Sequence, residues 1–276
     1  MKVIAIANPA GGCGQTTTVV SLAGALASEG FAVLVVEADP RANISAFFKS
    51  KTIAPHVLAD LFSNVPVHLD EISASDTDAP VTGSLSTGPL DTKHLDTESL
   101  VGQTGVENIQ LIQAGEHLNE AVAATPGRHG AGLILRTFLD RLDGQQDYVL
   151  IGCPTDLKLL MVNAIAACTT MIIPVPAGSD NPDAVASLLN LVQMIEKSKA
   201  KVIKKIVLPT RHDDQAENAD DAITVMKQAF GEDLWSGFIP VDSKFGEALE
   251  QSVPIVAVDA KTPGAVAYRQ LLSTLT

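Results

Sequence analysis

Short hydrophobic runs alternate with longer stretches of mixed hydrophobic and polar residues along most of the chain. Runs rich in Ile, Val and Leu are typical of strands that are buried on both faces of a parallel sheet. They predict strands at residues 2–8, 32–37, 109–113, 148–151, 170–175 and 204–209. The stretches between them predict helices at residues 16–28, 55–62, 131–142, 183–197, 219–230 and 264–275. This alternation indicates an α/β fold, with one doubly wound, mostly parallel sheet and helices on both faces.

The segment from Asn64 to Glu107 interrupts the alternation. It is rich in Ser, Thr, Asp, Pro and Gly and shows no sustained hydrophobic period. Such a composition is typical of a long surface loop or a partly disordered insertion. We therefore expect residues 1–276 to form a single domain with an insertion at about residues 64–107. Both a partner-binding role and a simple tolerated insertion remain open for this segment.

Composition narrows the environment of the protein. Hydrophobic residues make up 46% of the chain and aromatic residues only 4%, so the core must be mostly aliphatic. No stretch approaches the ~20 apolar residues of a membrane span, and the N-terminus begins with a strand rather than a signal peptide. The three cysteines form no Cys-x-x-Cys pair, which argues against a disulfide framework. We expect a cytoplasmic protein without a membrane anchor.

A glycine-rich loop, residues 10–17, joins the first predicted strand to the first predicted helix and reads Ala-Gly-Gly-Cys-Gly-Gln-Thr-Thr. Glycines let backbone N–H groups crowd around phosphate oxygens at the positive end of a helix. The ordinary phosphate-binding loop reads Gly-x-x-x-x-Gly-Lys-Ser/Thr, in which the lysine reaches the terminal phosphates and the hydroxyl holds magnesium. Here Pro9 replaces the first glycine and Gln15 replaces the lysine.

Further motifs follow the loop in order. Residues 33–43 carry a hydrophobic run followed by Glu-Ala-Asp-Pro-Arg-Ala-Asn, residues 148–154 carry a second buried run, and residues 163–167 a small helical segment. Near the C-terminus stand Ile239-Pro240, Glu247-Ala248, Pro254-Ile255 and Ala267-Tyr268. Together with the loop, these segments resemble the deviant Walker A motif, the second motif, the Walker B strand and the C-terminal segment of the ParA/MinD family of partitioning and cell-division ATPases. The resemblance implies a P-loop NTPase fold.

The resemblance also implies a site. ATP or ADP with magnesium would be the ligand, and Thr16 stands at the magnesium-ligand position. Asp39 occupies the position that the family uses to orient the attacking water, so it is the catalytic candidate. The turn at residues 209–213 is a plausible place near the base. The implied nucleotide-binding residues are Gly11, Gly12, Cys13, Gly14, Gln15, Thr16 and Thr17.

Three charged groups of the family are missing together. The lysine that crosses a dimer interface aligns with Ala10, the lysine that contacts the β- and γ-phosphates aligns with Gln15, and the Walker B aspartate aligns with Gly152. A hydrogen bond to a charged group contributes about 1.5–3 kcal/mol, so losing the second lysine alone should weaken triphosphate binding about ten- to a hundredfold. Phosphoryl transfer depends on stabilising developing charge. We therefore expect hydrolysis to be slow or absent.

Alternatives remain at several residues. The loop is either a weak or altered nucleotide site or a plain connection that keeps its glycines for geometry. Asp156 is a candidate replacement for the lost carboxylate. Cys13 is either a reactive thiol, since a helix N-terminus lowers a thiol pKa, or simply the variable residue of the loop.

The net charge of −13 separates classes of partner. Nonspecific DNA binding requires a basic footprint, and Val241 stands where the family has an arginine for DNA. A lysine cluster at residues 197–205 is either a solvated helix end, favoured by the helix dipole, or a nucleic-acid patch. The C-terminal residues 268–276 do not form the basic amphipathic helix of a membrane anchor. We expect a protein partner or cargo adaptor, a homodimer, no nonspecific DNA binding and no membrane binding.

Two functions follow from these expectations. The first is a ParA-like protein that partitions or positions a plasmid, a chromosome or a protein complex, with a degenerate nucleotide site. The second is a ParA-derived scaffold or adaptor, a pseudo-ATPase that acts through protein–protein contacts. We favour the first without assuming turnover.

Overall fold

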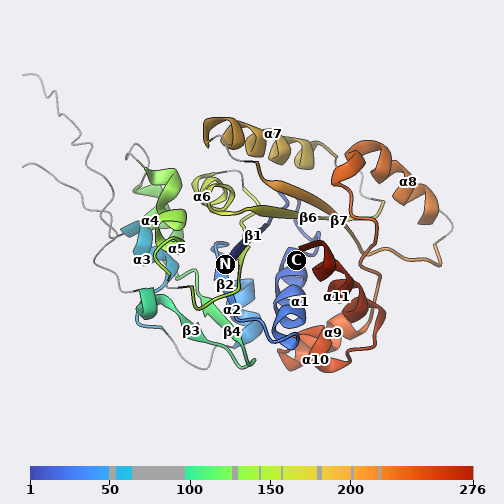
Figure 1. Ribbon diagram of the computed structural model, residues 1–276, viewed down its shortest axis with the longest axis horizontal. Coiled ribbons are helices and arrows are strands. Elements are labelled where there is room, and N and C mark those ends of the chain that lie inside the picture. The colour runs from blue at the N-terminus through green and yellow to red at the C-terminus, as the bar shows by residue number, and fades with distance from the viewer. Residues whose placement is uncertain are drawn as a thin grey trace, which may run out of the picture.

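The computed structural model describes residues 1–49, 54–63, 97–125, 130–142, 144–156, 158–178, 182–199, 202–216 and 219–275. Its centre is a seven-stranded sheet (Figure 1) in the order β3-β4-β2-β5-β1-β6-β7. Neighbouring strands run parallel except at one edge, where β3 pairs antiparallel with β4. The strands are β1 (Lys2–Ile6), β2 (Val33–Glu37), β3 (Gly102–Gln103), β4 (Ile109–Ile112), β5 (Tyr148–Gly152), β6 (Thr170–Pro176) and β7 (Lys204–Thr210).

Helices cover both faces of the sheet and bury a separate core on each (Figure 1). Because side chains alternate along a strand, Ile4 and Ile6 enter one core whereas Ala5 and Ala7 enter the other. The first core packs against α1 (Gln15–Ser28), α2 (Asn43–Phe48), α9 (Lys244–Gln251), α10 (Ile255–Val258) and α11 (Pro263–Leu275). The second packs against α3 (Leu58–Ser63), α4 (Leu118–Ala123), α5 (Ile134–Leu139), α6 (Leu159–Ala167), α7 (Pro182–Lys199) and α8 (Ala219–Phe230).

The predicted fold class is confirmed, and all six predicted strands are present within two residues of their expected ends. The helix predicted at residues 55–62 is present, but its predicted start was wrong, because α3 begins at Leu58. The Asp60 carboxylate accepts a hydrogen bond from the Val57 N–H at 2.9 Å and satisfies the backbone just before this helix. The range 131–142 consists of a 3₁₀ turn, η2 (Ala131–Leu133), followed by α5.

Of the predicted insertion at residues 64–107, residues 64–96 lie outside the described residues. The remaining part contains a 3₁₀ turn, η1 (Thr97–Leu100), and the edge strand β3, neither of which the sequence predicted. A third 3₁₀ turn, η3 (Gly231–Asp233), follows α8. Among the described residues, no helix combines the length and apolar character that a bilayer crossing requires.

Candidate functional site

The glycine-rich loop lies at the carboxyl end of β1 and ends where α1 begins. Gly12 has φ 73° and Gly14 has φ 91°, in the left-handed region that costs a residue with a side chain about 1–2 kcal/mol. The Gly14 carbonyl accepts a hydrogen bond from the Thr18 N–H at 2.8 Å and so begins α1. The first N–H groups of a helix have no partner within it. The loop therefore keeps the backbone turn and the helix N-terminus that a phosphate site requires.

Buried polar contacts hold the loop at both of its ends. Asn8 is 1% exposed, and its Nδ2 donates to the Pro174 carbonyl at 2.7 Å while its Oδ1 accepts from the Ala10 N–H at 2.8 Å. Further along the loop, Thr210 Oγ1 donates to the Cys13 carbonyl at 3.0 Å. Because these contacts come from β6 and β7, the loop conformation is fixed by the sheet.

A cavity of about 500 Å³ opens beside the loop. Asn43, at the start of α2, also borders it, as does the C-terminal segment through Phe245 and Tyr268. The segment after β7 contributes Thr210 and Arg211. Of the residues that the resemblance implied for nucleotide binding, the cavity is lined by Gly12, Cys13, Gly14, Gln15, Thr16 and Thr17.

Two implied residues lie elsewhere. Gly11 is exposed and is not part of this lining. Asp39 borders a neighbouring cavity of about 770 Å³ together with Asp156 and Lys158. Asp156 forms an ion pair with Lys158, Oδ2 to Nζ at 3.0 Å, and lies away from the loop cavity. The structure therefore gives no support to Asp156 as a replacement for the Walker B carboxylate.

Cys13 and Gln15 differ in how the loop presents them. Cys13 is 1% exposed, and burial raises the pKa of its thiol above the ordinary value of 9.0, outweighing backbone hydrogen bonds and nearby arginines that lower it. The structure therefore favours the other alternative, that Cys13 is simply the variable residue of the loop, because burial disfavours the thiolate. Nε2 of Gln15 is buried and has no hydrogen-bond partner among the described residues.

The end of the Ile44 side chain covers the Walker B position. Gly152 ends β5 directly beside Glu37 of β2, and a Cβ atom on Gly152 would lie 2.3 Å from Cδ1 of Ile44. Ile44 itself is 3% exposed and belongs to the core that packs against α1. A side chain at position 152 would therefore require the terminal methyl group of Ile44 to turn away.

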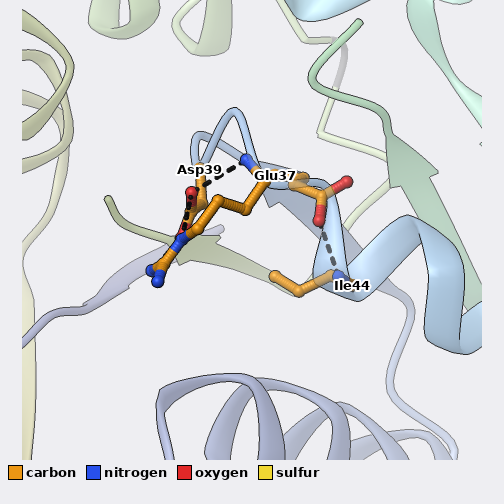
Figure 2. A network of polar contacts seen from close by, with 4 residues as sticks. Glu37, Asp39 and Ile44 are labelled. Atoms are coloured by element: carbon orange, nitrogen blue, oxygen red, sulfur yellow. Dashed lines mark hydrogen bonds and ion pairs between the residues drawn. The ribbon is translucent and has the colours of Figure 1, made fainter. Parts of the chain in front are cut away.

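Glu37 holds Ile44 in that place, as Figure 2 shows. Its side chain is fully buried, and its Oε1 accepts hydrogen bonds from the N–H groups of Ile44 at 2.6 Å and Ser45 at 3.2 Å. The Ser45 hydroxyl also donates to Oε2. Burial raises the pKa of Glu37, and these hydrogen bonds lower it by less. Glu37 thus satisfies the first N–H groups of α2 and fixes the direction in which that helix leaves the sheet.

Asp39 is engaged by an arginine. Its carboxylate accepts from the Arg41 backbone N–H at 3.0 Å, from Nε at 3.0 and 3.1 Å, and from Nη2 at 2.6 Å. The side chain of Asp39 is 13% exposed and that of Arg41 is 53% exposed. The pair raises the pKa of Arg41, chiefly through these hydrogen bonds. Both residues lie in the connection between β2 and α2, and Figure 2 shows Asp39 near Glu37.

Comparison with known proteins decides the family. A family model described as an AAA domain matches residues 1–205. Over 98% of its length the chain is 27% identical to the sporulation initiation inhibitor protein Soj of Bacillus subtilis, of which it covers 96%. It is also 28% identical to the chromosome partitioning protein ParA of Caulobacter vibrioides, over 98% of this chain and 92% of that protein. The chain belongs to the ParA/MinD family.

The fold of this ParA/MinD-family protein is shared with solved structures. Apo McdA from Cyanothece aligns with a TM-score of 0.76 and 23% identity, over 99% of both chains. An ATP complex of a variant of the same McdA aligns with a TM-score of 0.76 and 21% identity, over 99% of this chain and 95% of that one. At these identities the likeness shows the fold.

The residues of this family member fit a phosphate group. The left-handed glycines, the start of α1 and the unpartnered Gln15 donor fit phosphate oxygens. For a magnesium ion, Thr16 lines the cavity and offers a hydroxyl, whereas Gly152 offers no carboxylate. Within the described ranges, no group of three or more His, Cys, Asp and Glu side chains could hold a metal ion.

Sequence reasoning missed three residues around the site: Glu37, Arg41 and Ile44. The turn at residues 209–213, which was expected near the base, does border the cavity through Thr210 and Arg211. Arg41 carried a signal, because it stands where the family motif has glutamine and is two residues from Asp39. Ile44 carried none, because its contact with Gly152 joins two segments that are far apart in the sequence.

Proposed function

We propose that this ParA-like protein positions a plasmid, a chromosome region or a protein complex, and that its loop cavity binds nucleotide phosphates without efficient hydrolysis. The carrying observation is a contrast within one site. The backbone turn at Gly12 and Gly14 is intact, whereas position 152 carries a glycine in place of the Walker B aspartate and lies against the end of the Ile44 side chain. This contrast supports a retained phosphate cradle without the carboxylate that would support a metal.

Slow turnover follows from the charges around the cradle. Ala10 and Gln15 are neutral where the family has lysines, so developing charge on a transferred phosphoryl group lacks its main stabilisers. In the ligand-free protein Asp39 is paired with Arg41 at 2.6 Å, so it can orient a water molecule only when this pair opens. We infer a protein whose nucleotide affinity is weak and whose hydrolysis is slow or absent.

The test is a calorimetric titration with ATP and ADP, combined with phosphate release and with light scattering for dimerisation. We expect the natural protein to bind about ten to a hundred times more weakly than Gln15→Lys, in which one charged hydrogen bond is restored. Phosphate release should stay at background in both. Micromolar ATP affinity accompanied by steady phosphate release would overturn the proposal.

A scaffold or adaptor is the second candidate, and the Asp39–Arg41 ion pair favours it, because the pair occupies the family's catalytic aspartate in the ligand-free protein. In this case neither the natural protein nor Gln15→Lys should bind at millimolar ATP. Oligomeric state should then be independent of nucleotide.

A protein partner suits this chain better than DNA. Of the lysine cluster at residues 197–205, Lys204 Nζ donates to the Thr274 carbonyl at 2.5 Å, and Lys205 pairs with Glu196 at 3.3 Å. These contacts support the solvated helix end over a nucleic-acid patch. The three cysteines are buried and form no disulfide, which suits a cytoplasmic location. A filter-binding assay with random-sequence DNA at physiological salt should show no retention.

A further inference from the structure

Two arginines line the loop cavity, although neither belongs to the loop. Arg41 comes from the connection between β2 and α2, and Arg211 directly follows β7. Together they place two positive charges beside a loop that has none of its family's lysines. The cavity therefore carries more positive charge than the sequence of the loop alone indicates.

Arg211 is positioned against the loop by its backbone and its side chain. Its φ is 55°, a left-handed conformation that is uncommon for a residue with a side chain. Its Nη1 donates to the Gly12 carbonyl at 3.2 Å. A guanidinium group carries five N–H donors in a planar fork, so this contact leaves donors for a ligand beside Gly12.

Arg41 is held by a carboxylate that a phosphate could replace. Its guanidinium contacts both oxygens of Asp39, and the planar fork of arginine matches a phosphate as well as a carboxylate. Arg41 borders both the loop cavity and the neighbouring cavity of Asp39. Its exposed guanidinium can therefore turn toward the loop without the backbone moving.

The electrostatics of the cavity agree with this geometry. Both arginines lie near enough to Cys13 to lower the pKa of that thiol, against the larger effect of burial. Among the residues that line the cavity, the opposing charge is Asp242. Its two carboxylate oxygens accept from the backbone N–H groups of Lys244 at 2.9 Å and Gly264 at 3.0 Å. In a chain of net charge −13, this cavity is a local site for an anion.

We infer that Arg41 and Arg211 replace the loop lysines and hold the polyphosphate of a nucleotide without magnesium, with Asp39 competing for Arg41. The inference rests on the proposed function, in which the loop cavity binds nucleotide phosphates. Magnesium would neutralise the charge that the arginines recognise, and Gly152 offers no carboxylate to support the ion. Free polyphosphate is thus the form that this site suits.

Calorimetric titration with ATP and with inorganic tripolyphosphate, each in magnesium and in EDTA at constant ionic strength, tests this inference. Affinity in EDTA should equal or exceed affinity in magnesium. Arg41→Gln and Arg211→Gln should each weaken both ligands about tenfold or more. Arg136→Gln is the matched control, because Arg136 pairs with Asp140 at 3.5 Å in α5, outside the cavity lining. Its affinities should stay within about twofold of the natural protein.

Asp39→Asn distinguishes a phosphate-binding role of Arg41 from a purely structural one, because a structural role would leave tripolyphosphate affinity unchanged. Releasing Arg41 should strengthen tripolyphosphate binding several-fold, whereas the same substitution in the Arg41→Gln background should have little effect. Such a double-mutant cycle isolates the coupling between the two residues. Urea unfolding of each variant verifies that the fold is kept.

The outcomes separate the two proposals. A natural protein that binds neither ligand overturns the proposed function and this inference together. Binding that requires magnesium, or that is unchanged in both arginine variants, overturns this inference alone. If Arg211→Gln weakens ATP but leaves tripolyphosphate unchanged, Arg211 contacts the nucleoside, and its assignment to phosphate is overturned.

Discussion

The side chain of Ile44 occupies the space into which a side chain at Gly152 would extend. A Cβ atom on Gly152 would lie 2.3 Å from Ile44 Cδ1, and the Ile44 N–H donates to the buried Glu37 carboxylate at 2.6 Å. The Ile44 side chain thus lies over the position where the family has its Walker B aspartate. A side chain restored there would require the end of Ile44 to change its rotamer.

Adding a side chain at Gly152 should destabilise the protein. We expect Gly152→Ala to lower the free energy of unfolding by about 0.5–1.5 kcal/mol, because the end of the Ile44 side chain must leave its preferred rotamer. Gly152→Asp should lower the free energy of unfolding further, since it would bury a carboxylate that has no hydrogen-bond or ion-pair partner prepared for it. Urea unfolding measures both effects.

A second substitution identifies the cause. Ile44→Ala removes the clashing Cδ1, so the double variant Ile44→Ala/Gly152→Ala should be more stable than the two separate losses predict. Gly246→Ala is the control, because a Cβ atom there meets nothing within 4 Å. Additive losses would contradict the role of Ile44.

The glycines of the loop should differ in their tolerance of a side chain. Gly14→Ala should destabilise the protein by about 1–2 kcal/mol, because its φ of 91° is left-handed and an alanine there is strained. A Cβ atom on Gly11 meets nothing within 4 Å and needs no left-handed backbone, so Gly11→Ala should be neutral. Thermal and urea unfolding compare the two. Equal losses would show that the loop does not hold the described turn.

The long elements of this fold could be predicted because each shows a complete pattern. Strands such as β1 and β6 are continuous apolar runs, and α8 was predicted at its observed bounds. Short elements have no complete hydrophobic period. The sequence therefore missed α2, α4, α9, α10 and the two-residue strand β3.

The site was predictable where it depends on backbone and on motif order. The glycines and the helix that follows them predicted the phosphate-binding turn. Gln15, which stands where the family has a lysine, indicated the loss of a positive charge. By contrast, Arg211 follows β7, two strands away from β1, and its side chain contacts the Gly12 carbonyl. Ile44 belongs to α2 and contacts Gly152 at the end of β5. Such contacts depend on the order of strands in the sheet, which local patterns do not encode.

Cys13 should resist alkylation in the folded protein. Burial raises the pKa of its thiol, and the reactive form is the thiolate, so iodoacetamide at pH 8 should modify Cys13 only slowly until urea unfolds the chain. Peptide mass spectrometry follows Cys13 separately from Cys153 and Cys168, which are also buried. Rapid labelling of Cys13 in the native protein would contradict its burial under the loop.

Glu37 should make stability depend on pH in an unusual direction for a carboxylate. Burial raises its pKa above the ordinary value of 4.5, so the folded protein binds this proton more tightly than the unfolded chain. The contribution to stability is then present below pH 4.5 and is lost as pH rises through the folded pKa. Glu37→Gln keeps an acceptor for the Ile44 N–H but cannot ionise. The difference in unfolding free energy, natural protein minus Glu37→Gln, should therefore fall as pH rises from 4 and then level off.

Urea unfolding across this pH range, with both proteins in the same buffers, cancels the contributions of other titrating groups. Glu250→Gln, at an exposed position of α9, is the control and should show no such difference. A difference that rises with pH would mean that the hydrogen bonds from Ile44 and Ser45 outweigh burial. Glu37 would then hold α2 as a fully charged group. Ile44, which lies against Gly152, would be held more strongly at neutral pH than in acid.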